Sequence, residues 1–132
     1  MGGNQSFSKG ERLHGKDAIE EVFQQGKAIH MHPFKVLFLP KDEGQKEFSR
    51  LAIVVGKRNF RHASDRNLLK RRIREAYRTN KSIFLDSLEK TNSKCTWILI
   101  YVSHSILPYN EIREKIILTL QRLTNEYEKV NK

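Results

Sequence analysis

The chain has 132 residues, of which 38% are hydrophobic and 30% are charged. This length fits one domain whose core is large enough to fold without a metal or a disulfide. Lys and Arg total 25 against 15 Asp and Glu, so the net charge is +10 at pH 7. A charge this large says little about the fold, but it favours a polyanionic partner, either nucleic acid or an anionic membrane surface.

A membrane is the weaker of these two alternatives. The longest apolar run, Trp97 to Val102, is much shorter than the ~20 residues that a transmembrane helix needs. Residues 1–10 lack the apolar stretch of a signal peptide. The single cysteine, Cys95, excludes a disulfide within the chain and is typical of a reducing compartment. We therefore expect a cytoplasmic protein with no membrane partner.

Hydrophobic spacing and turn residues divide the chain into alternating helices and strands. In chain order, we expect a flexible lead-in over 1–10, a helix over 16–25 with Gly26 as its C-cap, and a strand near 27–32. Two strands follow over 34–39 and 51–55, separated by a turn over 40–48 with Gly44 at the bend. The rest of the chain is expected to form a loop over 57–64, a helix over 66–80 capped by Asp65, further helix over 82–90, a strand over 96–102, and a last helix capped by Asn110.

This order, αβββαβα, predicts an α+β fold in which helices pack on one sheet as a single αβ sandwich over residues 11–130. The run 96–102 is apolar on both faces, which favours a central strand. The helix over 66–80 has one apolar stripe for burial, formed by Leu69, Ile73, Ala76 and Tyr77.

The positive charge is concentrated in one segment. From Lys57 to Arg78, nine basic and two acidic residues give +7 of the net +10. Like charges at four-residue spacing on a helix repel one another, so such a run predicts an anionic partner that relieves the repulsion. Arginine forms paired hydrogen bonds to phosphate, which favours nucleic acid as that partner. The alternative is a solvated basic face without a partner. Four of these bases recur every four residues and share one helix face: Arg66, Lys70, Arg74 and Arg78.

The segment Ala63 to Glu75, ASDRNLLKRRIRE, resembles the RNR signature of the bacterial ribonuclease P protein subunit. The basic pair Lys57-Arg58 precedes it, and the resemblance covers about residues 10 to 125. The chain departs from the usual family pattern in a loop over 58–63 that is one residue longer and lacks glycine, in Ser64 and in Ile19. The residues that match the signature are Arg66, Asn67, Lys70, Arg71 and Arg74.

The resemblance implies an αβ sandwich with a left-handed βαβ crossover, which general topology rules disfavour. It also implies a subunit of ribonuclease P, the endoribonuclease that removes the 5′ leader of precursor tRNA and produces the mature 5′ end. In that family the RNA subunit and its Mg²⁺ ions carry the catalysis, so no catalytic residue, metal site or cofactor is expected in this chain. The expected partners are the catalytic RNA and the 5′ leader, with no obligate protein partner.

The resemblance further implies two binding sites. A cleft between the first helix and one face of the sheet would hold the leader, lined by Ile19, Phe23, Lys35 and Leu37. Alternation places Lys35 and Leu37 on the face opposite Phe34 and Val36, and either face could form this cleft. Phe23 could stack on a base or belong to the core. Lys57 and Arg58 could bind the catalytic RNA or the leader. The residues expected to bind the catalytic RNA are Lys57, Arg58, Arg61, Arg66, Asn67, Lys70, Arg71, Arg74 and Arg78.

The residues themselves predict no catalytic centre. A metal-dependent nuclease needs converging carboxylates, whereas Asp and Glu are scattered along this chain. Glu75 is surrounded by arginines and is interpreted as an ion-pair partner of Arg71 or Arg78. His30 and His32 have a spacing that could hold a transition metal, but no third ligand is evident. Two alternatives stay open: a ribosomal-type protein that binds structured RNA, and a DNA-binding regulator that places helix 66–80 in a major groove.

Overall fold

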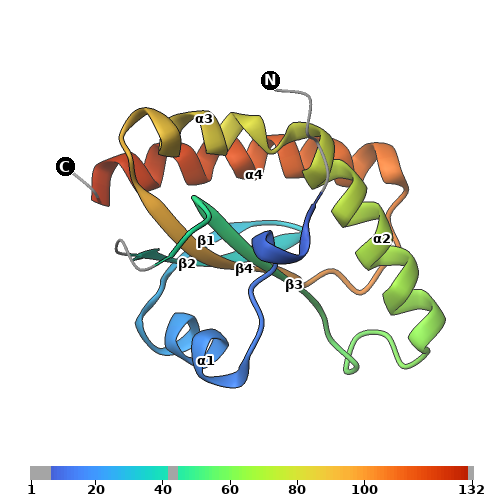
Figure 1. Ribbon diagram of the computed structural model, residues 1–132. Helices are drawn as coiled ribbons and strands as arrows, with labels where there is room; N and C mark the ends of the chain where they lie inside the picture. Colours follow the sequence, from blue (N-terminus) through green and yellow to red (C-terminus); the bar gives the residue numbers. More distant parts are fainter. Residues whose placement is uncertain (1–6, 42–44, 131–132) are drawn as a thin grey trace.

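The computed structural model describes residues 7–41 and 45–130 (Figure 1). The elements in chain order are the 3₁₀ helix η1 (Lys9–Glu11), α1 (Lys16–Gln25), β1 (Lys27–Met31), β2 (Phe34–Lys41), β3 (Ser49–Val55), α2 (Ala63–Asn80), α3 (Ser82–Lys90), β4 (Lys94–Tyr101) and α4 (Tyr109–Val130).

The strands form one mixed sheet in the order β1-β2-β4-β3. β2 pairs antiparallel with β1 and with β4, whereas β3 pairs parallel with β4, with Ser49 opposite Cys95 and Val55 opposite Tyr101. β4 therefore has a neighbour on each side and is mostly buried, which confirms the predicted central strand. The chain from β3 through α2 and α3 to β4 is a crossover between parallel strands, and its left hand stays a prediction from the resemblance.

The helices cover the two faces of the sheet unequally, as Figure 1 shows. The face with Phe34, Val36 and Phe38 packs against α2, α3 and α4 in the larger core cluster. The opposite face carries Leu37 and packs against α1 in a smaller cluster. The predicted α+β class with a single αβ sandwich is thereby confirmed, and among the described residues α1 is the one α-helix packed on this face of the sheet.

Two of the predicted helix N-caps, Asp65 and Asn110, are wrong, because both helices begin earlier in the chain. α2 begins at Ala63 with His62 as its N-cap, so Asp65 lies in the first turn, where the positive end of the helix dipole still favours its carboxylate. The chain is already helical before Asp65, because the Asp65 N–H donates to the carbonyl of His62 at 3.2 Å. α4 begins at Tyr109, so Asn110 is likewise inside the helix.

The other predicted elements are found, with shifted ends. The helix over 16–25 and the strand near 27–32 are confirmed as α1 and β1, and 82–90 forms a separate helix after Lys81. Gly26 is the predicted C-cap; its N–H donates to Val22 O at 2.8 Å, and a Cβ there would lie 2.5 Å from that oxygen. The strand from Phe34 continues to Lys41, and Gly44 lies outside the described residues.

The beginning of the described chain is packed rather than free. The ring of Phe7 meets that of Tyr77 edge-on, with centroids 5.4 Å apart, and Leu13 is buried. The Leu13 N–H donates to Leu51 O at 3.0 Å and so attaches this segment to the edge of β3. The flexible lead-in predicted over 1–10 therefore does not describe residues 7–10, and residues 1–6 lie outside the described part of the chain. We call residues 7–13 the N-terminal segment.

Two polar aromatic side chains in the core differ in their hydrogen bonding. Trp97 Nε1 donates to Ser49 Oγ at 2.9 Å, and its ring lies 5.8 Å from that of Tyr77. Within residues 7–41 and 45–130, the hydroxyl of Tyr77 is the one buried side-chain polar atom without a hydrogen-bond partner. Burial raises the pKa of this phenol, and the nearby Ser49 hydroxyl offsets only part of the rise.

We expect Tyr77→Phe to leave the free energy of unfolding unchanged or to raise it by up to about 1 kcal/mol, because it removes a buried hydroxyl that makes no hydrogen bond. Trp97→Phe should instead lower it by about 1–3 kcal/mol, because a hydrogen bond and packing volume are lost together. Urea unfolding at pH 7 measures both values. A loss above about 1 kcal/mol for Tyr77→Phe would mean that its hydroxyl is stabilised by a bond.

Candidate nucleic-acid interface

Helix α2 places an apolar stripe in the core and most of its basic side chains outside it. The predicted stripe is confirmed, since the buried residues of α2 are Leu69, Ile73, Ala76 and Tyr77. Arg71 and Arg74 are exposed, and Lys70 is partly exposed. At a rise of 1.5 Å per residue, the row of bases from Arg66 to Arg78 is roughly 18 Å long. Burial of one side of α2 thus presents the other side to a partner.

One arginine of the RNR segment holds the loop that precedes α2. Arg66 Nη1 donates to the carbonyl oxygens of Phe60 at 2.8 Å and Arg61 at 3.0 Å. Phe60 is buried, and its ring centroid lies 6.0 Å from that of Tyr101. Sequence reasoning missed Phe60, although a lone aromatic residue within a basic loop is a signal for an anchor. With the loop anchored in this way, the side chains of its other basic residues are exposed.

Two further arginines of α2 make contacts within the protein. Arg78 pairs with Glu75 through Nη2–Oε2 at 2.7 Å and Nε–Oε1 at 3.1 Å, which confirms Arg78 as the partner of Glu75. This hydrogen bond holds the pKa of Glu75 below its ordinary value and that of Arg78 above it. Arg72 Nη1 donates to Leu107 O at 2.7 Å and so ties α2 to the loop before α4.

The remaining basic side chains of the segment form no hydrogen bond or ion pair with any residue in the described ranges. No carboxylate in the described ranges therefore pairs with these charges, and Asn67 beside them is exposed as well. We call this set the basic surface; it comprises Lys57, Arg58, Arg61, Lys70, Arg71 and Arg74.

A groove of about 330 Å³ runs along β3 and brings the N-terminal segment and α2 together. Residues 51–54 form its apolar part, and Ile19 of α1 contributes to its wall. Arg12, Lys70 and Arg74 line the same groove. An apolar surface with cations beside it suits single-stranded nucleic acid, because bases pack on the one and phosphates pair with the other. We call this the β3 groove.

The residues predicted to line a leader cleft lie in different surroundings. α1 covers the sheet face that carries Lys35 and Leu37, but Leu37 is buried against Val22. Ile19 lines the β3 groove, whereas Lys35 is partly exposed and is not one of the lining residues. Phe23 is 50% exposed, so it is not a core residue and its ring remains accessible.

Arg12 is a groove residue that sequence reasoning did not select. Its guanidinium carbon lies 5.5 Å from the ring centroid of Phe7, and its backbone forms a bridge to Leu51 of β3. In the sequence, Arg12 lies far from the segment Lys57 to Arg78 that carries most of the positive charge. Its position beside Lys70 and Arg74 depends on chain segments that are distant in sequence.

The described residues offer little other chemistry. They contain no group of three or more His, Cys, Asp or Glu side chains that could hold a metal ion. Cys95 is fully buried, and this burial raises the pKa of its thiol, so the reactive thiolate is disfavoured. No helix in the described part of the chain has the length and apolar character to cross a membrane.

Comparison with known proteins identifies relatives of the whole domain. The sequence matches the Ribonuclease P family over residues 7–124. It is 34% identical over 117 residues to the ribonuclease P protein component of Porphyromonas gingivalis, which covers 89% of this chain and 85% of that protein. It is 40% identical over 79 residues to the Thermotoga maritima component, covering 60% of this chain and 64% of that protein.

Solved structures agree with the sequence comparison. The fold is similar to that of the ribonuclease P protein from Thermotoga maritima, with a TM-score of 0.66 and 28% identity over 85% of this chain and 96% of that one. It is also similar to the Staphylococcus aureus ribonuclease P protein, with a TM-score of 0.67 over 86% and 97% of the chains; at 20% identity this likeness concerns the fold alone. The family match over most of the chain, together with these relatives, shows that the chain belongs to the ribonuclease P protein family.

Proposed function

We propose that this protein is the protein subunit of ribonuclease P and binds both the catalytic RNA and the 5′ leader of precursor tRNA. The observation that carries the proposal is the basic surface, whose cations have no partner among the described residues. A helix with like charges at four-residue spacing is destabilised unless an anion relieves the repulsion. A folded RNA with closely spaced phosphates supplies that anion.

The basic surface would bind the catalytic RNA by neutralising phosphates. Arginine forms paired hydrogen bonds to phosphate, and both arginine and lysine release counterions from RNA when they bind. With about six phosphates neutralised, the logarithm of the binding constant should fall with the logarithm of the salt concentration at a slope of roughly −4 to −5. Lys57 and Arg58 belong to this surface, and their position on the loop would also allow contact with the leader.

The β3 groove would hold the single-stranded leader. Arg12, Lys70 and Arg74 would pair with leader phosphates, and bases would pack on the partly exposed residues 52–54 and Ile19. The exposed ring of Phe23 offers a further stacking surface. Since mature tRNA has no leader, these contacts would favour the precursor over the product.

In this proposal the protein contributes binding and positioning, while the RNA and its Mg²⁺ ions carry out hydrolysis of the phosphodiester bond. The chain would need no cofactor of its own and no obligate protein partner, and it would act in the cytoplasm where tRNA is processed. The protein would raise the rate by neutralising RNA charge, so that the RNA folds at lower Mg²⁺, and by holding the substrate in register.

A ribosomal-type protein that binds structured RNA is the second candidate, because the same basic surface would serve it. The β3 groove favours the ribonuclease P subunit, since a protein that binds only folded RNA has no need of a channel for a single strand. A DNA-binding regulator is disfavoured because strand β3 precedes α2, in place of the first helix of a helix-turn-helix.

Reconstitution with ribonuclease P RNA tests the function. We expect the protein to stimulate cleavage of precursor tRNA at low Mg²⁺ and to generate the mature 5′ end, because it reduces the repulsion that Mg²⁺ otherwise screens. Gel analysis of 5′-labelled precursor measures the rate and the cleavage position. An unchanged rate across a range of Mg²⁺ concentrations would favour the ribosomal-type alternative.

Arg74→Ala and Arg66→Ala should differ in stability while both weaken binding to the catalytic RNA. Arg74→Ala is expected to change the free energy of unfolding by less than about 0.5 kcal/mol, since its side chain is exposed. Arg66→Ala should cost about 1–3 kcal/mol, because it leaves the Phe60 and Arg61 carbonyls without their donor. Both should reduce the salt slope by about one unit.

Thermal unfolding and filter binding over a salt series measure the two effects. Arg113→Ala on the exposed side of α4 is the matched control, which should change neither. An Arg74→Ala variant that loses its cooperative unfolding transition would identify Arg74 as a structural residue and remove it from the proposed interface.

A further inference from the structure

A largely buried ion pair holds the N-terminal segment against the end of the basic helix. Glu11 and Lys81 are 70 residues apart in sequence, and Lys81 Nζ lies 3.1 Å from Oε1 and 2.9 Å from Oε2 of Glu11. Their side chains are only 15% and 9% exposed, respectively. Lys81 is the residue that joins α2 to α3. The pair therefore ties η1 to the end of α2.

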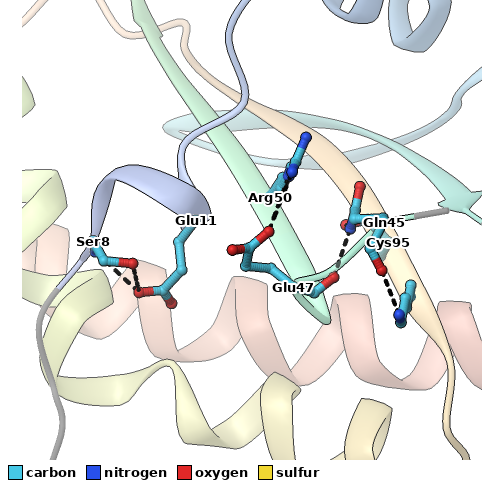
Figure 2. A network of polar contacts seen from close by, with 7 residues as sticks. Ser8, Glu11, Gln45, Glu47, Arg50 and Cys95 are labelled. Carbon is cyan, nitrogen blue, oxygen red and sulfur yellow. Dashed lines mark hydrogen bonds and ion pairs between the residues drawn. The ribbon is translucent and has the colours of Figure 1, made fainter. Parts of the chain in front are cut away.

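Glu11 also fixes the backbone of the N-terminal segment. Its Oε1 accepts the N–H of Ser8 at 3.0 Å and the hydroxyl of Ser8 at 3.1 Å (Figure 2). One carboxylate thus accepts bonds from the turn that precedes it and from Lys81. The neighbouring carboxylate of Glu47 is engaged elsewhere, since its Oε1 pairs with Arg50 Nη2 at 3.2 Å (Figure 2).

The residue that follows Glu11 is Arg12, which lines the β3 groove. The Arg12 N–H donates to Lys9 O at 3.2 Å, so Arg12 closes the η1 turn that Glu11 stabilises. Its guanidinium also contacts Phe7, by Nη2 to Phe7 O at 3.5 Å and by its position over the ring. The place of Arg12 in the groove therefore depends on the turn that the carboxylate of Glu11 holds.

We propose that Glu11 is a positioning residue for RNA binding: through its ion pair with Lys81 it holds Arg12 in the groove that Lys70 and Arg74 also line, without touching RNA itself. This inference rests on the proposed function, because it requires the β3 groove to bind an RNA strand. For removal of the Glu11 charge, the positioning role and simple electrostatics predict opposite changes in RNA affinity. Removing an acid raises the net charge of +10 by one unit and should tighten binding to a polyanion, whereas loss of Arg12 from its position should weaken it.

The first test measures affinity in the complex of the full-length chain with ribonuclease P RNA. We expect Glu11→Gln to weaken binding of a precursor tRNA with a single-stranded leader by about fivefold, since one charged contact is lost, and to leave binding of mature tRNA unchanged. Lys81→Gln should weaken precursor binding similarly, although it changes the net charge in the other direction. Glu89→Gln is the matched control, because Glu89 is exposed and carries the same charge; it should leave binding unchanged or slightly tighter.

A double-mutant cycle tests whether Glu11 acts through Arg12. In an Arg12→Ala background, Glu11→Gln should have no further effect on precursor affinity, because the group that it positions is already absent. The salt slope should fall by about one unit in Glu11→Gln, as is expected for Arg12→Ala. A loss of equal size in both backgrounds, or tighter precursor binding by Glu11→Gln, would overturn the proposal.

Two comparisons separate this inference from folding and from the proposed function. Replacing both members of a largely buried ion pair by neutral side chains is often tolerated, so Glu11→Gln with Lys81→Met should restore the free energy of unfolding, while precursor affinity stays about fivefold weaker because the ion pair that holds η1 is absent. A folded double variant that binds the precursor as tightly as the original chain would contradict the positioning role. If Arg12→Ala and Arg74→Ala themselves leave precursor binding unchanged, the leader groove of the proposed function is what fails.

Discussion

The burial of one side of helix α2 is the constraint on which the rest of the molecule depends. Like charges at four-residue spacing destabilise a helix by a few tenths of a kcal/mol per pair. Each buried apolar side chain such as Leu69 or Ile73 contributes about 1.5–3 kcal/mol, so packing against the sheet readily offsets the repulsion. The folded helix can therefore carry a row of like charges that would destabilise it in isolation, and these charges remain exposed to a partner.

The arginines of α2 show that residue type alone does not define a binding role. Arg66 holds loop carbonyls, Arg78 pairs with Glu75, and Arg74 is exposed beside the β3 groove. Their sequence spacing is regular, but the groups that surround each one differ. An exposed guanidinium without a partner is available to phosphate, whereas one bound to a carbonyl or a carboxylate must first give up part of that interaction or bind through its remaining donors.

The groove and the basic surface share α2, since Lys70 and Arg74 belong to both. In the proposed function this sharing would link the two RNA contacts mechanically, because a shift of α2 moves both. The N-terminal segment is attached to the same helix by Phe7 on Tyr77 and by Glu11 on Lys81. The groove wall and the basic helix are thus joined by direct side-chain contacts.

The sequence by itself determined the helices and strands, the central position of β4, the buried stripe of α2 and the location of its charges. These features are readable because they depend on local periodicity and on residue type. The helix starts at Ala63 and Tyr109 were missed because a cap depends on the path of the preceding loop. Only the tertiary structure decided which sheet face α1 covers and which groups meet in the groove. Glu11 and Lys81 are far apart in the chain, and their contact forms only when η1 comes to lie beside the end of α2. A pattern of neighbouring residues in the sequence therefore cannot predict it.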